Sequence, residues 1–291
     1  VTTAQGNLPQ NSTKRMTDEL KQRLRAVKHV ALDMDGTIYL GSTLFPYTVP
    51  FLEKLDRMGI GYSFLTNNPT KSIEAYLENL RKRGVPCRPD QMYSSAVATV
   101  DYIRTHYPEA RNLFLLGTPS MIEQFEQAGF RSCADDPEDR PDVVVAAFDM
   151  TLQYSRLCRC AWWASQGLPY IATNPDWVCP TDQPTVLVDC GSICACIEAA
   201  TGRKPDVVIG KPNPDILFGI LDKKGLKPQE AAIVGDRIYT DVKTGINAGA
   251  VGVLVLSGET TIEAARASDV VPTLICRDIE ELGNLLEESR N

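Results

Sequence analysis

Residues 30–37, Val-Ala-Leu-Asp-Met-Asp-Gly-Thr, constrain this chain more than any other segment. An apolar run there ends in two aspartates, Asp33 and Asp35, which are separated by one residue. Side chains alternate between the faces of a strand, so the two carboxylates would point the same way if the chain stayed extended. Gly36 and Thr37 then break the strand and open a loop. The pattern predicts two carboxylates at a strand's carboxyl end, where open α/β sheets place their ligands.

A second segment of the same kind lies further along the chain. Residues 60–65 read as a short buried strand, and Thr66 and Asn67 come directly after it. A hydroxyl, an amide and backbone N–H groups at a strand end can hold an anion. The same residues also suit a helix N-cap, so this segment alone does not decide between the two interpretations.

Two more segments place a polar group after an apolar strand. In residues 207–214, Lys211 lies between a predicted strand and a predicted helix. This is not a P-loop, because no Ser or Thr follows the lysine and the upstream glycine spacing is absent. Asp236 ends an apolar strand that begins at Ala231, and Asp241 falls in the first turn of the next helix. The helix dipole also favours an acid there, so the pattern has a purely structural explanation as well.

Together the four segments predict one site. In a parallel sheet with helices on both faces, all these strand ends open on the same edge. Four carboxylates are expected there, from Asp33, Asp35, Asp236 and Asp241. Like charges about 5 Å apart repel by roughly 3 kcal/mol per pair at an effective dielectric of about 20. A divalent cation removes this conflict, and an all-oxygen donor set favours Mg²⁺ over Zn²⁺. Thr66 and Lys211 are then suited to an anion that the metal also contacts.

These motifs resemble those of the haloacid dehalogenase-like hydrolases, in the family's order. They are Asp33-Met-Asp35-Gly-Thr, Thr66, Lys211, and Gly235-Asp236 followed by Asp241. Longer stretches resemble the NagD-type, 4-nitrophenylphosphatase-like phosphatases, and the likeness covers about residues 28–290. These stretches are residues 33–41, 65–69, 172–176, 210–214 and 235–241. The resemblance implies a Mg²⁺-dependent phosphatase that acts on small phosphomonoesters.

The resemblance also implies a role for each residue of the motifs. Asp33 attacks phosphorus to form an aspartyl phosphate, and Asp35 protonates the leaving group and later activates water. This work requires a raised pKa for Asp35, which we expect from burial and neighbouring charge. The metal is held by the Asp33 carboxylate, the Asp35 backbone carbonyl and Asp236, while Asp241 orients a water on the metal. The phosphoryl oxygens are held by Thr66, Asn67 and Lys211.

Strand and helix signals alternate along the chain, which predicts an α/β fold with a mainly parallel sheet and helices on both faces. The motifs lie only in residues 1–87 and 205–291, which we predict to form a Rossmann-like core with a tail at 1–15. Residues 88–204 carry their own strand and helix pattern, and we predict an inserted α/β cap domain. The resemblance assigns it to the C2 class of caps. Within it, Asn174 and Asp176 are candidates for contact with substrate, although an Asn-Pro turn explains them equally well.

Composition narrows the range of partners. The chain carries a net charge of −7 with acids and bases well mixed, so no basic stripe indicates nucleic acid. No apolar run approaches the roughly 20 residues that span a membrane, and residues 1–13 lack a signal-peptide core, so we expect a cytoplasmic protein. The nine cysteines lack zinc-site spacing, and we expect Cys194 and Cys196 to be core side chains. A small phosphomonoester is the expected partner, with a homodimer left open.

Two alternatives to a phosphatase remain open from the sequence. A phosphotransferase or mutase would use the same aspartate and pass the phosphoryl group to another acceptor. A phospho-ligand sensor would bind Mg²⁺ and phosphate without turnover. A Ser–His or Cys–His hydrolase is poorly supported, because the chain has only two histidines and no Gly-x-Ser-x-Gly elbow.

Overall fold

The computed structural model describes residues 16–181 and 183–291, so the tail predicted at residues 1–15 lies outside the described part. The chain forms two compact units. The first contains the described residues of Val1–Phe64, with Arg83–Pro86 and Lys224–Asn291, and the second contains Leu65–Lys82 and Cys87–Lys223. The second unit is therefore larger than the segment 88–204 that the sequence analysis assigned to an inserted cap. The role of that segment as a cap stays a prediction.

A parallel sheet forms the centre of the first unit. The strands that this unit contributes to the sheet lie in the order β15-β14-β13-β1-β4. Their bounds are β1 His29–Leu32, β4 Gly61–Thr66, β13 Ala231–Gly235, β14 Val251–Val255 and β15 Leu274–Cys276. The central strands are buried along their whole length, which explains why they read as continuous apolar runs in the sequence. The predicted α/β fold class is confirmed.

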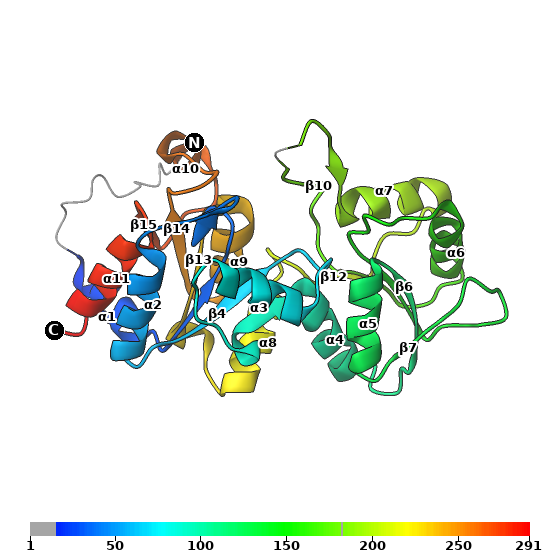
Figure 1. Ribbon diagram of the computed structural model, residues 1–291, viewed down its shortest axis with the longest axis horizontal. Coiled ribbons are helices and arrows are strands. Elements are labelled where there is room, and N and C mark those ends of the chain that lie inside the picture. The colour runs from blue at the N-terminus through cyan, green and yellow to red at the C-terminus, as the bar shows by residue number, and fades with distance from the viewer. Residues whose placement is uncertain (1–15, 182) are drawn as a thin grey trace, which may run out of the picture. The chain divides into compact units, whose positions relative to one another are not determined.

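Helices cover both faces of this first sheet. Figure 1 shows α1, α2 and α11 on one side and α9 on the other. This follows from right-handed crossovers, because β1 leads to β4 in one direction along the sheet and β13 leads to β14 in the other. The helices are α1 Asp18–Ala26, α2 Thr48–Arg57, α9 Lys243–Ala248, α10 Ile262–Ala267 and α11 Ile279–Glu288. A short hairpin, β2 Tyr39–Leu40 and β3 Thr43–Leu44, follows β1.

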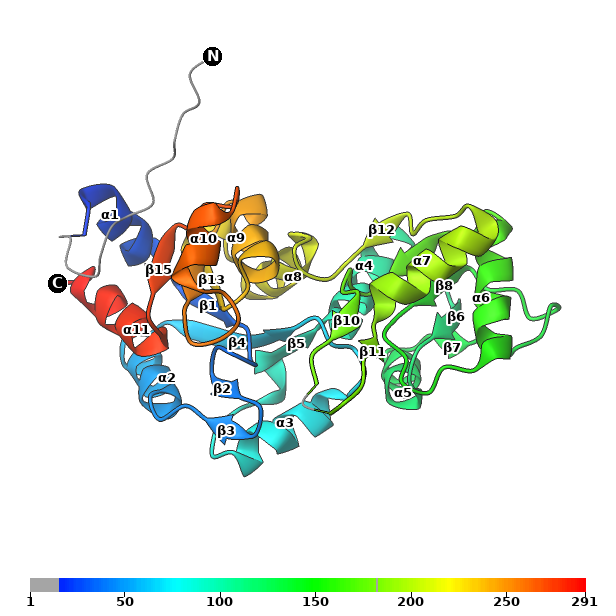
Figure 2. The same ribbon diagram turned by 90° about the horizontal axis from the view of Figure 1, so that it is seen from above.

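The second unit has a parallel sheet of its own, in the order β12-β9-β8-β6-β7. Figure 2 shows α6 and α7 along one side of it, while α4 and α5 pack together. The strands of this unit are β5 Met92–Ser94, β6 Asn112–Leu116, β7 Arg131–Ser132, β8 Val143–Ala146, β9 Tyr170–Ala172, β10 Val178–Cys179, β11 Leu187–Val188 and β12 Val207–Val208. The helices are α3 Ile73–Lys82, α4 Ser95–His106, α5 Pro119–Gln127, α6 Tyr154–Ser165, α7 Cys190–Thr201 and α8 Asp215–Lys224.

Two local expectations differ from the structure. The strand near Val207, which we grouped with the core, pairs with β9 of the second sheet. Cys196 is exposed and is not the core side chain that we expected, whereas Cys194 is buried. All nine cysteines are free thiols.

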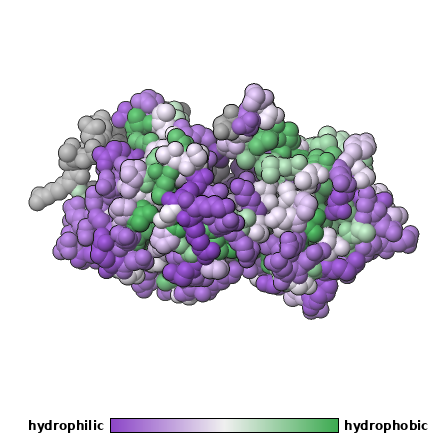
Figure 3. Space-filling model, in the orientation of Figure 1, coloured by the Kyte–Doolittle hydropathy of each residue, from purple (hydrophilic) through white to green (hydrophobic). Residues whose placement is uncertain are grey.

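The surface of the second unit includes an apolar hairpin. Strands β10 and β11 pair antiparallel, and their exposed side chains include Trp177, Val178, Val186 and Val188. Figure 3 shows hydrophobic residues gathered on this part of the visible face, against a largely hydrophilic background. No helix in the described part of the chain is both long and apolar enough to cross a membrane.

His29, at the start of β1, couples the stability of the first unit to pH. Its ring is buried and its Nε2 lies 2.9 Å from the Ser63 hydroxyl on the neighbouring strand β4. Burial, and then the nearby positive charge of Lys224, lower the pKa of His29 from 6.5 to about 3. The His29 ring therefore takes up a proton near pH 6.5 in the unfolded chain but only near pH 3 in the folded chain. Falling pH across this window destabilises the fold.

His29→Gln removes the titrating ring and keeps a hydrogen-bonding group for Ser63. Between pH 6.5 and pH 4.5, the wild-type free energy of unfolding should fall by about 2 to 3 kcal/mol more than that of the variant. Urea titrations of both proteins at the two pH values measure this difference. Parallel losses in the two proteins would contradict the assignment of the proton to His29.

Candidate active site

Neighbouring strands bring Asp33 and Asp236 to the same sheet edge. Strands β1 and β13 are parallel neighbours with Leu32 opposite Val234. Asp33 follows β1 directly, and its N–H donates to the Val234 carbonyl at 2.8 Å. Asp236 follows β13 in the same way. Asp33 and Asp236 therefore lie at the same edge of the sheet, as the sequence predicted.

Asp241 joins these two carboxylates through a π-helical turn. The turn spans Ile238–Val242, and a π-turn of this kind is common where a chain positions a functional group. The Arg237 N–H donates to Asp241 Oδ2 at 3.2 Å. Gly235 makes the approach sterically feasible, because a Cβ there would lie 2.1 Å from Asp241 Cγ. One carboxylate oxygen from each of Asp33, Asp236 and Asp241 lies within 4.8 Å of the others.

The Asp236 carboxylate is enclosed by the backbone. Its Oδ2 accepts the Glu259 N–H at 2.7 Å, and a Cβ on Gly36 or on Gly258 would come within 2.3 or 2.1 Å of that oxygen. Its Oδ1 is buried and has no hydrogen-bond partner among the described residues. Burial, and to a lesser extent the charge of Asp241, raise the pKa of Asp236 to about 6. Asp236 Oδ1 has therefore lost contact with water and receives no hydrogen bond from the described residues.

The arrangement fits a divalent metal ion. A buried carboxylate oxygen without a partner is costly, because it has lost its water and gained no donor. Three carboxylates that converge within 4.8 Å add mutual repulsion to that cost. A hard cation with oxygen ligands offsets both, and Mg²⁺ characteristically binds through a few carboxylates with water and phosphate in its remaining positions. The donor set thus matches the predicted Mg²⁺, while the Asp35 carbonyl as a ligand stays a prediction.

Asp35 lies in a different environment from the one that we expected. It is exposed, whereas the sequence analysis placed it in a buried position. Its Oδ1 accepts the Gly41 N–H at 3.1 Å, and Gly36 after it has a φ of +80°, which favours glycine. The turn that follows Asp35 leaves its side chain exposed, and the expected burial is wrong.

The other predicted groups, Thr66, Asn67 and Lys211, all lie in the second unit, whose first residue, Leu65, falls within β4. Thr66 ends β4, and its hydroxyl accepts the Asn68 N–H at 3.2 Å. Asn67 bonds to the main chain of Lys211, with the Lys211 N–H donating to Asn67 Oδ1 at 2.7 Å. Lys211 is only 3% exposed. The structure thus brings two of these three residues into direct contact.

The loop residues Asn174 and Asp176 connect to the same group. Asn67 Nδ2 donates to Asp176 Oδ2 at 2.9 Å, and Asn174 Nδ2 donates to the same oxygen at 3.0 Å. Asn174 is buried, so its side chain is not at the surface of the loop. A cavity of about 240 Å³ borders this loop and is lined in part by Trp177 and Cys194.

Two parts of this arrangement were not predicted from the sequence. The first is the turn after β14, where Ser257 donates to the Gly36 carbonyl at 2.7 Å and Gly258 admits the Asp236 carboxylate. Its signal was available, because β14 is another apolar strand that ends in a polar Ser-Gly-Glu turn. The second is Asp189, which accepts from Asn174. Its signal was available too, because it follows the apolar residues 186–188 and precedes a helix.

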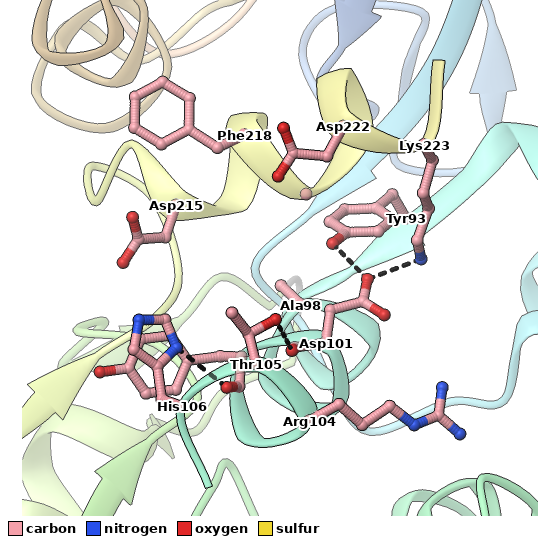
Figure 4. A pocket seen from close by; sticks show the side chains of 12 residues that line it. Tyr93, Ala98, Asp101, Arg104, Thr105, His106, Asp215, Phe218, Asp222 and Lys223 are labelled. Carbon is pink, nitrogen blue, oxygen red and sulfur yellow. Dashed lines mark hydrogen bonds and ion pairs between the residues drawn. The ribbon is translucent and has the colours of Figure 1, made fainter. Parts of the chain in front are cut away.

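A larger cavity, about 380 Å³, lies between α4 and α8 in the second unit. Figure 4 shows its side chains, with the Tyr93 hydroxyl and the Lys223 ammonium both directed at the Asp101 carboxylate. Those contacts are 2.7 Å and 2.6 Å long. No residue of the predicted site lines this cavity, so we place no step of the chemistry in it.

Comparison with known families agrees with the geometry. A sequence model described as Haloacid dehalogenase-like hydrolase matches residues 30–131, and one described as HAD-hydrolase-like matches residues 208–282. The first match includes Asp33 and Thr66, and the second includes Lys211 and Asp236. The chain is also similar to an acid sugar phosphatase of Staphylococcus aureus strain USA300, with 32% identity over 258 residues. That alignment covers 89% of this chain and 97% of the relative.

Solved structures show the same fold over nearly the whole chain. A 4-nitrophenylphosphatase from Thermotoga maritima is 40% identical, with a TM-score of 0.84 over 90% of this chain and 98% of that one. A p-nitrophenyl phosphatase from Archaeoglobus fulgidus is 30% identical, with a TM-score of 0.82 over 89% and 98%. NagD from E. coli K-12 is 29% identical, with a TM-score of 0.79 over 87% and 97%. The similarity spans both units.

Gly258→Ala tests whether the enclosure of Asp236 serves a metal. The added methyl group would overlap Asp236 Oδ2 and displace the carboxylate. We expect Mg²⁺ affinity, measured by isothermal titration calorimetry, to fall by about 10- to 100-fold, as when the support of a metal ligand is lost.

Gly283→Ala is the matched control, because it adds the same methyl group in the same unit beside Phe51 and away from the carboxylates. Its Mg²⁺ affinity should equal that of the wild type. Equal affinities in all three proteins would show that the Gly258 turn does not support a metal ligand.

Proposed function

We propose a reaction for this chain on the premise that it belongs to the haloacid dehalogenase-like hydrolases and, within them, to the NagD-type, 4-nitrophenylphosphatase-like group. Enzymes of this group are phosphoric monoester hydrolases. The proposed reaction is the Mg²⁺-dependent hydrolysis of small phosphomonoesters through an aspartyl phosphate. The observation that carries it is the convergence of the Asp33, Asp236 and Asp241 carboxylates, one of which has a buried oxygen, Asp236 Oδ1, with no hydrogen-bond partner among the described residues.

Asp33 is the proposed nucleophile. A carboxylate oxygen of Asp33 forms a bond to phosphorus while the bond from phosphorus to the leaving oxygen breaks. The residues that would hold Mg²⁺ are Asp33, Asp236 and the Asp35 carbonyl, with Asp241 beside them, and the ion would supply positive charge against the phosphoryl oxygens. The Asp33 N–H bond to Val234 fixes the main chain of the nucleophile on the sheet. A fixed nucleophile needs less ordering to reach its attack geometry.

Asp35 is the proposed acid and base. In the first step its proton passes to the leaving oxygen, so that the product departs as a neutral alcohol. In the second step the Asp35 carboxylate takes a proton from a water molecule, whose oxygen attacks phosphorus as the bond to Asp33 breaks. Phosphate is released, and the Asp33 carboxylate is restored. The exposure of Asp35 allows its proton to exchange with bulk water between turnovers.

The proposed phosphate-binding groups are the Thr66 hydroxyl and the Lys211 ammonium. The chain is acidic overall, with a net charge of −7, so long-range attraction does not favour an anionic substrate. Affinity must therefore come from local positive charge, which Lys211 and the metal supply. A buried lysine is worth more to an anion than an exposed one, because less water screens the interaction.

The proposed substrates are small phosphomonoesters, such as sugar phosphates, phosphoglycolate, glycerol phosphate or nucleoside monophosphates. The names of the relatives support small substrates. They include an acid sugar phosphatase, a 4-nitrophenylphosphatase and a p-nitrophenyl phosphatase. The loop near residues 174–177 also resembles the substrate-facing segment of the NagD-type family.

Asp33→Asn is the direct test of this function. The amide keeps the shape of the side chain but is not a nucleophile, so hydrolysis of 4-nitrophenyl phosphate should fall by at least about 10³-fold. The wild type should lose activity in EDTA and regain it with Mg²⁺. The matched control, Asp142→Asn, changes a carboxylate that binds the main chain of Arg111 and Asn112 in the second unit, and it should keep the wild-type rate.

Each alternative gives a different result in this assay. A wild type that binds phosphate and Mg²⁺ without turnover would be a sensor. A wild type that releases nitrophenolate faster when alcohols are added, with less free phosphate, would be a phosphotransferase. Asp33→Asn with near wild-type hydrolysis would overturn the nucleophile assignment itself.

A further inference from the structure

The side chain of Asn67 holds the main chain of Lys211 at both ends of the residue. The Lys211 N–H donates to Asn67 Oδ1 at 2.7 Å, and Asn67 Nδ2 donates to the Lys211 carbonyl at 3.0 Å. These partners fix which end of the amide is oxygen and which is nitrogen, because a main-chain N–H needs an acceptor and a carbonyl needs a donor. The Asn67 amide therefore accepts one hydrogen bond from the Lys211 main chain and donates one to it, as a neighbouring strand would.

This pairing leaves the Asn67 side chain without a donor for substrate. A primary amide has two N–H groups, and those of Asn67 go to the Lys211 carbonyl and to Asp176 Oδ2. Phosphoryl oxygens only accept hydrogen bonds, so a side chain with no N–H remaining cannot bind them. The phosphate-binding role that the sequence suggests for this side chain is thus better given to the residue that it holds.

A chain of hydrogen bonds supports Asn67, part-buried at Asp176 and fully buried at Asn174 and Asp189. Asp176 Oδ2 accepts from Asn67 at 2.9 Å and from Asn174 at 3.0 Å. The other N–H of Asn174 donates to Asp189 Oδ1 at 2.9 Å, and that oxygen also accepts the Cys190 N–H at 2.6 Å. Asp189 is the N-cap of α7, so the chain of bonds ends on the first turn of a 12-residue helix. Asn174 and Asp189 are only 1% and 4% exposed, which gives the chain a rigid base.

Gly210 gives independent support for this arrangement. A Cβ on Gly210 would lie 2.8 Å from Asn67 Oδ1, 2.8 Å from Asn174 Cβ and 2.9 Å from Asn174 Cα. The last two are not the ends of flexible side chains, so they cannot move aside easily. The residue before Lys211 must therefore lack a side chain for both asparagines to reach their places.

We propose that Asn67 is a positioning residue for Lys211, held in turn by Asp176, Asn174 and Asp189. This inference rests on the proposed role of Lys211 in phosphate binding. A lysine side chain has four rotatable bonds, so a defined ammonium position requires at least a defined main chain. The two hydrogen bonds with the Asn67 side chain fix the main chain of Lys211. Asn174 and Asp176 serve here as the support of the phosphate site, in place of the direct substrate contact that the sequence left open for them.

A double-mutant cycle tests the inference, with 4-nitrophenyl phosphate as substrate and inorganic phosphate as inhibitor. Asn67→Ala should raise both KM and the phosphate inhibition constant by about 10-fold, and Lys211→Met by about 100-fold. The double variant should match Lys211→Met alone, because Asn67 acts through Lys211. Gly210→Ala should reproduce Asn67→Ala without removing any polar group, and Asp176→Asn should stay closer to the wild type than Asp176→Ala.

Asn68→Ala is the matched control, because Asn68 is the next residue and its Oδ1 bonds to Thr70, not to Lys211. Its KM and inhibition constant should stay within about twofold of the wild type. Effects of Asn67→Ala and Lys211→Met that multiply in the double variant would overturn the inference, since Asn67 would then act independently. An unchanged phosphate inhibition constant in both Asn67→Ala and Gly210→Ala would also overturn it. A wild type without phosphatase activity would instead refute the proposed function.

Discussion

Carboxylate repulsion at one sheet edge is the constraint on which the rest of the first unit depends. Asp33, Asp236 and Asp241 converge there, and one oxygen of Asp236 is buried without a partner among the described residues. Such an arrangement costs stability, because unpaired buried charge is neither solvated nor neutralised. The fold nevertheless holds the carboxylates together. Gly36, Gly235 and Gly258 make this possible, because a Cβ at any of them would overlap Asp236 or Asp241. Stability given up at one place in a fold commonly marks a functional site.

In the second unit, the comparable constraint is the position of the flexible Lys211 side chain. Lys211 follows a strand of only two residues, so the sheet alone defines its place poorly. The amide of Asn67 and the buried groups behind it add that definition from three separate segments of the chain. The polar network is satisfied along its length, and such networks rigidify a site. The proposed nucleophile and metal ligands belong to the first unit, and the proposed phosphate-binding residues belong to the second.

Much of this could be predicted from local sequence pattern. The strand β13 ends where its apolar run meets Asp236, because an alternating α/β chain places polar groups at strand ends. The exposure of Asp35 could not be predicted, since it depends on the turn at Gly36 and not on strand alternation. The pairing of β12 with β9 was missed because two short parallel strands give no pattern that names their neighbour. The contact between Asp189 and Asn174 could not be predicted, because the two residues are separated in sequence and meet only in the fold.

The melting temperatures of the wild type and Asp236→Asn, each with and without Mg²⁺, test the central claim most directly. The claim is that the fold accepts carboxylate repulsion in order to bind a cation. Without Mg²⁺, the variant should melt above the wild type, because one charge is gone and the amide can donate to its neighbours. With Mg²⁺, the wild type should rise and the variant should change little. A variant that melts below the wild type without Mg²⁺, or that gains as much from the ion, would contradict the account.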